Sequence, residues 1–291
     1  MLMLRSPLFV PGNKENMLAK ALALDVRPDA IVPDMEDSVP DAEKASARST
    51  IAAMLPRLAA AGAPVIPRVN ALETGLTEQD LESVVGPHVT GVSIGKIRTA
   101  ADVSEVSNLI AKLETRAGLP VGRLRLVLWI ETAAAIVNLT EICRASERVA
   151  ALAFGAEDFT HDLGIERLED ETPLAYARSA ICIAARAANV LALDTPYFRL
   201  RDPDGLLKNA IAAKSLGFKG KFAIHPEQIP VLNDAFAPSE REIAHARRVV
   251  EAFEEAERRG RGSTSLEGWV IDVPVVKRAR ALLELAERTR R

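Results

Sequence analysis

The stretch LRLVLWIETAAAIVNLTEICRASERVAALAFGAED, residues 124–158, contains two short apolar runs, and acidic side chains follow each of them closely. The runs, at 124–130 and 149–154, are typical of strands buried on both faces. Glu131 comes directly after the first run, and Asp158 follows soon after the second. The stretch therefore predicts two buried strands that present carboxylates at their C-terminal ends.

Similar apolar runs recur along the chain, and patterns typical of helices separate them. Taken together, the runs lie at 8–10, 30–32, 64–69, 91–94, 124–130, 149–154, 190–193 and 221–224. Alternating strands and helices predict parallel pairing through right-handed crossovers. Eight such units predict an α/β fold closed into a TIM-type (β/α)8 barrel. A doubly wound open sheet is the competing architecture, but no glycine-rich dinucleotide fingerprint follows the first run.

The pattern changes near residue 238. Residues 1–237 are predicted to form the catalytic barrel, and residues 238–291 a C-terminal helical extension. Ser239 is the predicted N-cap of a long helix that Gly260 ends. A polar loop, the run VIDVP and a last helix from Pro274 follow. This segment is expected to be an appendage of the barrel, without a core large enough for a second domain.

The composition excludes several classes of function. A net charge of -3, with no basic stripe interleaved with aromatic residues, gives no reason to expect nucleic acid. No segment approaches the roughly 20 apolar residues of a membrane span, and the N-terminus lacks the pattern of a secretory leader. Cys143 and Cys182 make no metal-spaced pair and are expected to be buried, reduced thiols. These features predict a soluble cytoplasmic protein without membrane or nucleic-acid partners.

Charged or ionisable side chains follow nearly every predicted strand, at the end where barrel enzymes place their chemistry. In chain order they are Asp34, Glu36, Asp37, Arg68, Lys96, Glu131, Glu157, Asp158, Asp194 and His225, with the polar Asn70 after Arg68. Carboxylates gathered at one rim repel one another unless a cation neutralises them. A zinc site is not expected without a Cys or His cluster. Carboxylates completed by waters and substrate oxygens are the usual setting for Mg²⁺.

Each of these residues also has a purely local interpretation. Glu131 could be an acid favoured by the N-terminus of the following helix. Asp158 could be a helix cap or a loop acid, and Arg68 could merely pair with a carboxylate of the rim. The residue pattern alone leaves these alternatives open.

Several longer motifs, in a fixed order, carry a resemblance to a known family. They are RSPLFVPGN, PDMEDSV, PRVN, WIETAAA, AFGAEDFTHDLG, LDTPYFRLRDPDGL, GFKGKFAIHPEQI and GWVIDVP. The chain resembles citrate lyase beta-subunit-like proteins, which belong to the aldolase/citrate lyase superfamily with the malyl-CoA and citramalyl-CoA lyases. The resemblance runs from about residue 5 to residue 280, nearly the whole chain. It implies a TIM-like barrel and a metal-dependent carbon–carbon lyase.

The resemblance also implies roles for residues at the rim. Mg²⁺ would be bound by Glu131 and Asp158, and Arg68 would hold a substrate carboxylate. Glu36 and Asp37 would lie behind them, orienting the waters on the metal and the guanidinium of Arg68.

Further residues enter through the resemblance alone. Asp272 corresponds to an aspartate of a lid that transfers a proton at the acyl methyl group. From sequence alone it would be a helix cap before Pro274. Arg5 and Lys14 are expected to contact the CoA cofactor. The family further implies a homotrimer, or a hexamer built from trimers, in which the C-terminal extension covers a neighbour's active site.

The expected reaction is cleavage, or formation, of a 3-hydroxyacyl thioester such as malyl-, citramalyl- or citryl-CoA. The partners would be an acyl-CoA or acyl-carrier thioester and a 2-oxo acid. Two alternatives stay open. One is a class II aldolase acting on free hydroxy-keto acids, and the other is a non-catalytic subunit or binding protein that keeps the barrel.

Overall fold

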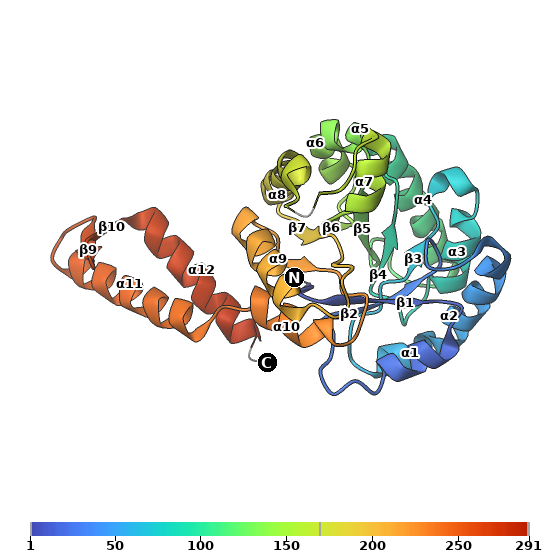
Figure 1. The fold of residues 1–291 in the computed structure, drawn as a ribbon, viewed down its shortest axis with the longest axis horizontal. Helices are drawn as coiled ribbons and strands as arrows, with labels where there is room; N and C mark the ends of the chain where they lie inside the picture. The colour runs from blue at the N-terminus through green and yellow to red at the C-terminus, as the bar shows by residue number, and fades with distance from the viewer. Residues whose placement is uncertain (1, 169, 290–291) are drawn as a thin grey trace. The chain divides into compact units, whose positions relative to one another are not determined.

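The computed structural model describes residues 2–168 and 170–289. The chain forms two compact units, Met1–Asn233 and Asp234–Arg291. In the larger unit a ring of strands is surrounded by helices (Figure 1). Within the described residues, no helix combines the length and apolar character needed to cross a membrane.

The strands of the larger unit form one parallel sheet in chain order. They are β1 (Pro7–Pro11), β2 (Ala30–Asp34), β3 (Arg68–Val69), β4 (Gly91–Ile94), β5 (Arg125–Ile130), β6 (Val149–Phe154), β7 (Leu191–Asp194) and β8 (Gly220–Lys221). The sheet closes on itself after β8. The backbone N–H of Phe9 donates to Ala223 at 2.9 Å, and that of Ala223 donates to Pro7 at 2.8 Å. This closure confirms the predicted barrel over the open sheet.

Helices cover the outside of the ring and connect successive strands (Figure 1). They are α1 (Glu15–Ala21), α2 (Lys44–Ala60), α3 (Thr77–Val84), α4 (Ala100–Arg116), α5 (Ala133–Val137), α6 (Leu139–Arg144), α7 (Ala156–Leu163), α8 (Ala175–Ala187), α9 (Pro203–Leu216) and α10 (Gln228–Phe236). Three short 3₁₀ turns, η1 (Asp41–Glu43), η2 (Leu72–Thr74) and η3 (Thr172–Leu174), lie in the connections. Each strand therefore has helices behind it and the barrel interior in front.

Alternate residues of each strand face the barrel interior, because side chains alternate across a strand. The interior cluster consists of Leu4, Ala30, Val32, Ile66, Val127, Trp129, Ala151, Ala153, Leu193 and Phe222. Phe9, Trp129 and Phe222 meet at its centre, with ring centroids 4.5–5.6 Å apart. The same alternation decides which residues at the C-terminal ends of the strands point into the open end of the barrel there, which we call the barrel mouth.

The smaller unit contains α11 (Glu240–Arg258), the antiparallel hairpin of β9 (Thr264–Leu266) and β10 (Trp269–Ile271), and α12 (Val273–Thr289). The predicted cap at Ser239 is confirmed. Its hydroxyl accepts a hydrogen bond from the backbone N–H of Glu242, and the Glu242 carboxylate accepts one from the backbone N–H of Ser239. Buried side chains pack between the helices: Ala246, Val249, Phe253, Ile271, Val276 and Ala279. The extension thus has a small core of its own.

Candidate active site

The candidate site is the top layer of side chains in the barrel mouth. Asp34 continues the inward-facing series of Ala30 and Val32, and Arg68 continues that of Ile66. Glu131 follows Val127 and Trp129 in the same way. All three are almost completely buried. Alternation therefore brings an arginine and two carboxylates from β2, β3 and β5 to one level.

Arg68 is held by acids on two of its edges. Its Nε and Nη2 donate to the two oxygens of Asp34, each at 2.7 Å. Its Nη1 lies 3.0 Å from Glu36 and 3.1 Å from Asp37. The guanidinium carbon sits 4.6 Å from the centre of the Phe9 ring. Burial acts to lower the pKa of Arg68, but the charge of Asp34 and its neighbours outweighs it and raises the pKa well above its usual value.

The loop after β2 is shaped so that Asp34 and Glu36 both face this arginine. Asp34 accepts hydrogen bonds from the backbone of Glu36 and from both the backbone and hydroxyl of Ser38. The buried ammonium of Lys44 donates to the carbonyls of Met35 and Glu36, at 3.0 and 2.7 Å. Where the chain leaves β2, these side-chain hydrogen bonds satisfy backbone groups that no longer pair with a neighbouring strand. They therefore hold the PDMEDS loop in one conformation.

Glu131 occupies the centre of the layer, only 2% exposed. Its Oε2 accepts one hydrogen bond, from the backbone N–H of Lys96 at 2.8 Å. Burial, together with the negative charges of Glu36 and Asp158, raises the pKa of Glu131 to about 8 against the smaller opposing effects of Lys96 and Arg68. A carboxylate in this position favours either a proton or a cation.

Asp158 lies in the first turn of α7, after the N-cap Gly155. Its negative charge contributes to the raised pKa of Glu131, so the two carboxylates lie near each other. The adjacent Glu157 is exposed and pairs with Arg167 at 2.6 Å. Asp158 is therefore neither the helix cap nor a loop acid, since Gly155 is the cap and Asp158 lies inside α7. Glu131 lies outside α5, whose cap is Thr132.

Lys96 links two of the acids. Its Nζ donates to Glu36 at 2.9 Å, while its backbone N–H bonds Glu131. To make both contacts it adopts a φ of 55°, an uncommon conformation for a residue with a side chain. Burial raises the pKa of Glu36, with Asp37 adding to the effect against Arg68 and Lys96. Burial acts to lower the pKa of Lys96, but Glu36 outweighs it and the pKa of Lys96 rises.

The residues fit a hard divalent cation. Glu131 and Asp158 offer oxygen ligands, and Glu131 is buried without a cation of its own bonded to its carboxylate. The acids of the layer outnumber its cationic partners, Arg68 and Lys96. No group of three or more His, Cys, Asp or Glu side chains suited to a metal occurs in the described parts of the chain. Two carboxylates completed by water and substrate oxygens are a setting for Mg²⁺.

Asp194 does not reach the mouth, although it follows a strand like the others. Leu193 faces the barrel interior, so Asp194 points outward. There it pairs with Lys221 at 2.7 Å and Arg178 at 2.9 Å, fully buried between strand and helix. The expectation that it contributes to the rim was wrong for this reason.

Arg5 lies at the opposite end of the barrel from the candidate site. It precedes β1, and its guanidinium pairs with Asp29, which precedes β2, at 2.8 Å. The parallel order of the strands puts this pair at their N-terminal ends, so the expected contact of Arg5 with CoA does not fit the fold. Lys14, in the turn after β1, lies at the same end as Glu131, and its Nζ is 3.8 Å from Glu43.

Asp272 belongs to the smaller unit and is exposed there. Its Oδ1 accepts a hydrogen bond from the backbone of Val275 at 3.2 Å, which is the helix-capping geometry that its sequence position suggests. The barrel thus brings together Arg68, Glu36, Asp37, Glu131 and Asp158, and it does not itself contain Asp272.

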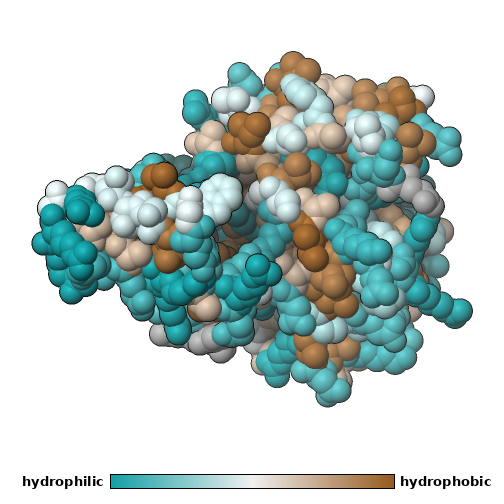
Figure 2. Space-filling model, turned by 60° about the vertical axis from the view of Figure 1, so that its left-hand side comes forward, coloured by the Kyte–Doolittle hydropathy of each residue, from teal (hydrophilic) through white to brown (hydrophobic). Residues whose placement is uncertain are grey.

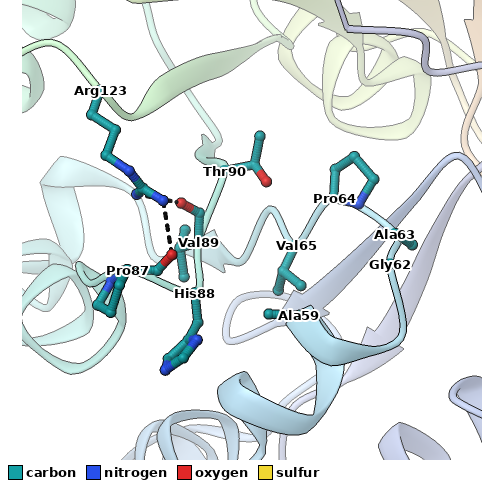
Figure 3. A pocket seen from close by; sticks show the side chains of 10 residues that line it. All are labelled: Ala59, Gly62, Ala63, Pro64, Val65, Pro87, His88, Val89, Thr90 and Arg123. Carbon is teal, nitrogen blue, oxygen red and sulfur yellow. Dashed lines mark hydrogen bonds between the residues drawn. The ribbon is translucent and has the colours of Figure 1, made fainter.

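A surface hollow at the other end of the barrel has no comparable chemistry (Figure 3). It has a volume of about 300 Å³ and lies before β4 and β5, between the segments around Pro64 and His88. The arginine beside it, Arg123, donates to the carbonyls of Gly86, Pro87 and Val89. Its charge is therefore used to hold a loop.

Comparison with known proteins identifies the family of the chain. The HpcH/HpaI aldolase/citrate lyase family matches residues 5–226. Citrate lyase subunit beta of Escherichia coli K12 is 40% identical over 97% of this chain and 93% of its own length. The mitochondrial citramalyl-CoA lyase of Rattus norvegicus is 31% identical over 97% of this chain and 86% of its own.

A solved structure extends the likeness to three dimensions. Protein CitE from Mycobacterium tuberculosis, in complex with magnesium, acetoacetate and coenzyme A, aligns with a TM-score of 0.80. It is 31% identical, and the alignment covers 98% of both chains. The resemblance inferred from the motifs is confirmed: this chain belongs to the HpcH/HpaI aldolase/citrate lyase family.

Proposed function

We propose that this chain is a Mg²⁺-dependent carbon–carbon lyase that cleaves, or in reverse forms, a 3-hydroxyacyl thioester carrying a carboxylate. The products of cleavage are a 2-oxo acid and an acetyl thioester, on CoA or on a carrier. The observation that carries the proposal is the position of Glu131, buried in the barrel mouth and facing Asp158 and Arg68. In this arrangement, carboxylates that would bind a cation lie next to an arginine that would bind a substrate carboxylate.

Glu131 and Asp158 would hold the metal ion. When bound, Mg²⁺ acts as a Lewis acid that stabilises negative charge on the substrate's oxygens. Glu131 would contribute a full negative charge in this state, because a nearby cation favours the ionised form and opposes the burial that raises its pKa.

Arg68 would orient the substrate's carboxylate. Its Nε edge is already taken by Asp34, so the substrate would approach the Nη1 side, where Glu36 and Asp37 lie. These two acids would keep the guanidinium plane in place and orient waters of the site. Arginine suits this task because its planar donors match a carboxylate, as a lysine's ammonium does not.

Cleavage would move one proton from oxygen and deliver one to carbon. The substrate's hydroxyl would give its proton to a water of the site, the bond between the carbinol carbon and the thioester's methylene would break, and its electron pair would form the thioester enolate. That enolate takes a proton at carbon. Asp272 from a neighbouring copy would deliver this proton, and it would remove it in the reverse direction. A residue in such a role contributes about 10²–10⁴-fold to the rate.

Two exposed features support an assembly of several copies. Beside Asp272, the β10 side chains Trp269 and Val270 are 80% and 70% exposed, which is unusual for large apolar groups. On the barrel, Tyr176 and Ile183 of α8 are 77% and 70% exposed. Figure 2 shows several groups of apolar side chains at the surface of the barrel unit. We propose a homotrimer, or a hexamer built of two trimers, in which the extension covers a neighbour's barrel mouth.

Lys14 is proposed to contact the phosphates of CoA. It is half-exposed, and its pairing with Glu43 is loose. It also lies at the end of the barrel that carries the candidate site.

A Mg²⁺-dependent assay of a substrate panel tests the proposed function. Malyl-, citramalyl- and citryl-CoA, their carrier-protein equivalents and the free hydroxy-keto acids are incubated with the protein, with Mg²⁺ or with a chelator, and the products are identified by mass spectrometry. Mg²⁺-dependent release of a 2-oxo acid from a thioester supports the proposal. Cleavage of free acids alone supports a class II aldolase. Binding without cleavage of any thioester supports a non-catalytic protein.

A further inference from the structure

Three neighbouring strands of the barrel end in a glycine, a glutamate and a glycine. Gly95 directly follows β4, Glu131 follows β5 and Gly155 follows β6. Inward-facing residues precede each of them: Ser93, which accepts from Trp129 at 2.8 Å, then Trp129 itself and Ala153. By alternation all three terminal positions face the barrel mouth. Glu131 therefore stands between two inward-facing positions that have no side chain.

Gly95 is needed for space and not for its backbone freedom. Its φ does not lie in the left-handed region. A Cβ placed on it would lie 2.8 Å from Oε1 of Glu36 and 3.1 Å from Oε2 of Glu131. A side chain at this position would therefore have to displace the ends of these two carboxylates.

Gly155 is closer still to Glu131. Its φ is -103°, which any residue can adopt. A Cβ there would overlap the Cγ and Oε1 of Glu131 and would lie 2.8 Å from its carboxyl carbon. The Glu131 side chain thus runs across the face of Gly155, and only a residue without Cβ leaves room for this path.

We propose that Gly95 and Gly155 are positioning residues for Glu131, forming a slot that sets the direction of its carboxylate and thereby the affinity of the site for a divalent cation. The backbone N–H of Lys96 completes the slot with a hydrogen bond to Oε2 at 2.8 Å. The inference rests on the proposed function, in which Glu131 binds the metal. It adds that two residues with no ligand atoms determine the strength of that binding.

Adding one methyl group at Gly95 tests the first wall of the slot. The Gly95→Ala variant is expected to fold, because the new Cβ meets the free ends of two side chains and not backbone. Gly86→Ala is the matched control, since Gly86 also has an ordinary φ and its Cβ would lie 3.9 Å from the nearest atom. Thermal melting under chelator is measured for both, and Mg²⁺ affinity by calorimetry.

The expected result is a loss of about 10–100-fold in Mg²⁺ affinity for Gly95→Ala, the usual range when the support of a metal ligand is altered. Gly86→Ala should bind Mg²⁺ as the parent protein does. Equal affinity in the two variants would overturn the inference and leave the proposed function standing. If the parent protein binds no Mg²⁺, the proposed function fails and the inference falls with it.

The second wall is tested by combining Gly155→Ala with truncation of Glu131 to alanine. Gly155→Ala alone is expected to melt below the parent, because the new methyl group collides with Glu131. Glu131→Ala removes Cγ and the carboxylate, which are the atoms that the new methyl group would meet, so Gly155→Ala should cost less stability in the Glu131→Ala background. Such coupling between neighbours appears in a double-mutant cycle. An equal cost in both backgrounds would show that Gly155 does not act through Glu131 and would overturn its assignment.

Discussion

Arg68 and Asp34 meet edge to edge in the barrel mouth, with Nε and Nη2 of the arginine each 2.7 Å from an oxygen of the aspartate. Both residues are buried, and the bond fixes the plane of the guanidinium against the Phe9 ring. Two of the five N–H donors of the guanidinium are therefore used by Asp34, and Nη1 also donates to Asp37. In the proposed function, a substrate carboxylate would approach Arg68 from the Nη1 side.

Asp34→Asn is expected to lower the free energy of unfolding by about 3 kcal/mol, because breaking a buried pair leaves an uncompensated charge. Asp37→Asn is the matched control. Its side chain is 52% exposed and it contacts the same arginine, so its loss should cost less than about 1 kcal/mol. Urea unfolding of the two variants measures the difference. Equal losses would mean that Asp34 does not hold Arg68 in the way its geometry indicates.

The pKa of Glu131 gives a pH dependence with a definite sign. Burial raises it from its ordinary value of 4.5 to about 8 in the protein without metal. Between these two values the folded protein keeps a proton that the unfolded chain releases, so the stability of the metal-free protein falls as the pH rises through this window. Mg²⁺ should restore that stability, since it favours the ionised form.

Glu131→Gln should remove both effects. In thermal melts, the variant should lose its part of the pH-dependent decline under chelator and should gain nothing from Mg²⁺. Glu157→Gln is the control, because Glu157 is next to Asp158 in the sequence but is exposed and paired with Arg167. This variant should keep the gain in stability from Mg²⁺. A Mg²⁺-dependent rise in melting temperature in Glu131→Gln would remove Glu131 from the metal site.

Sharing of the active site between copies predicts complementation. Glu131→Gln and Asp272→Asn should each be nearly inactive, at about 10²–10⁴-fold below the parent for Asp272→Asn. After the two are mixed, dissociated and reassembled, some barrels should pair an intact Glu131 with an intact Asp272, and activity should return. Two Glu131→Gln samples treated alike provide the baseline. No recovery, in a mixture shown by light scattering to have reassembled, would contradict a lid supplied by a neighbour.

Lys14→Ala is expected to raise the KM for CoA thioesters about tenfold, corresponding to about 1.4 kcal/mol, with little change in kcat. Lys20→Ala, an exposed lysine in the last turn of the same helix, is the control. Steady-state kinetics at saturating Mg²⁺ measure both. A KM equal to that of the control would exclude a role of Lys14 in binding the thioester's carrier.

The barrel could be predicted from sequence because its strands are continuous apolar runs buried on both faces. The runs that contain Trp129 and Phe154 end directly before the site, so Glu131 and the acids of α7 were found at the correct end. The same reasoning failed for Asp194. Its run is as apolar as the others, and only the inward position of Leu193 shows that the next side chain points outward.

Other parts of the site gave no signal in the sequence. Gly95 and Gly155 act through the absence of a side chain, and a glycine after a strand is ordinarily read as a turn. Pairing of Arg68 with a carboxylate of the rim was one of the alternatives left open by the sequence, but the identity of the partner, Asp34, depends on the alternation of side chains across two strands. Arg5 was assigned to CoA by resemblance, but its place before β1 puts it at the opposite end of the barrel.

The central claim is that Glu131 and Asp158 share one divalent ion, and a crystal structure grown with Mn²⁺ tests it most directly. Anomalous scattering locates the ion without reference to activity. One peak in the barrel mouth, bonded to an oxygen of each residue within about 2.3 Å, is the predicted result. A peak held by Glu36 and Asp37 instead, or no peak in the mouth at a Mn²⁺ concentration that saturates binding in solution, would contradict the account.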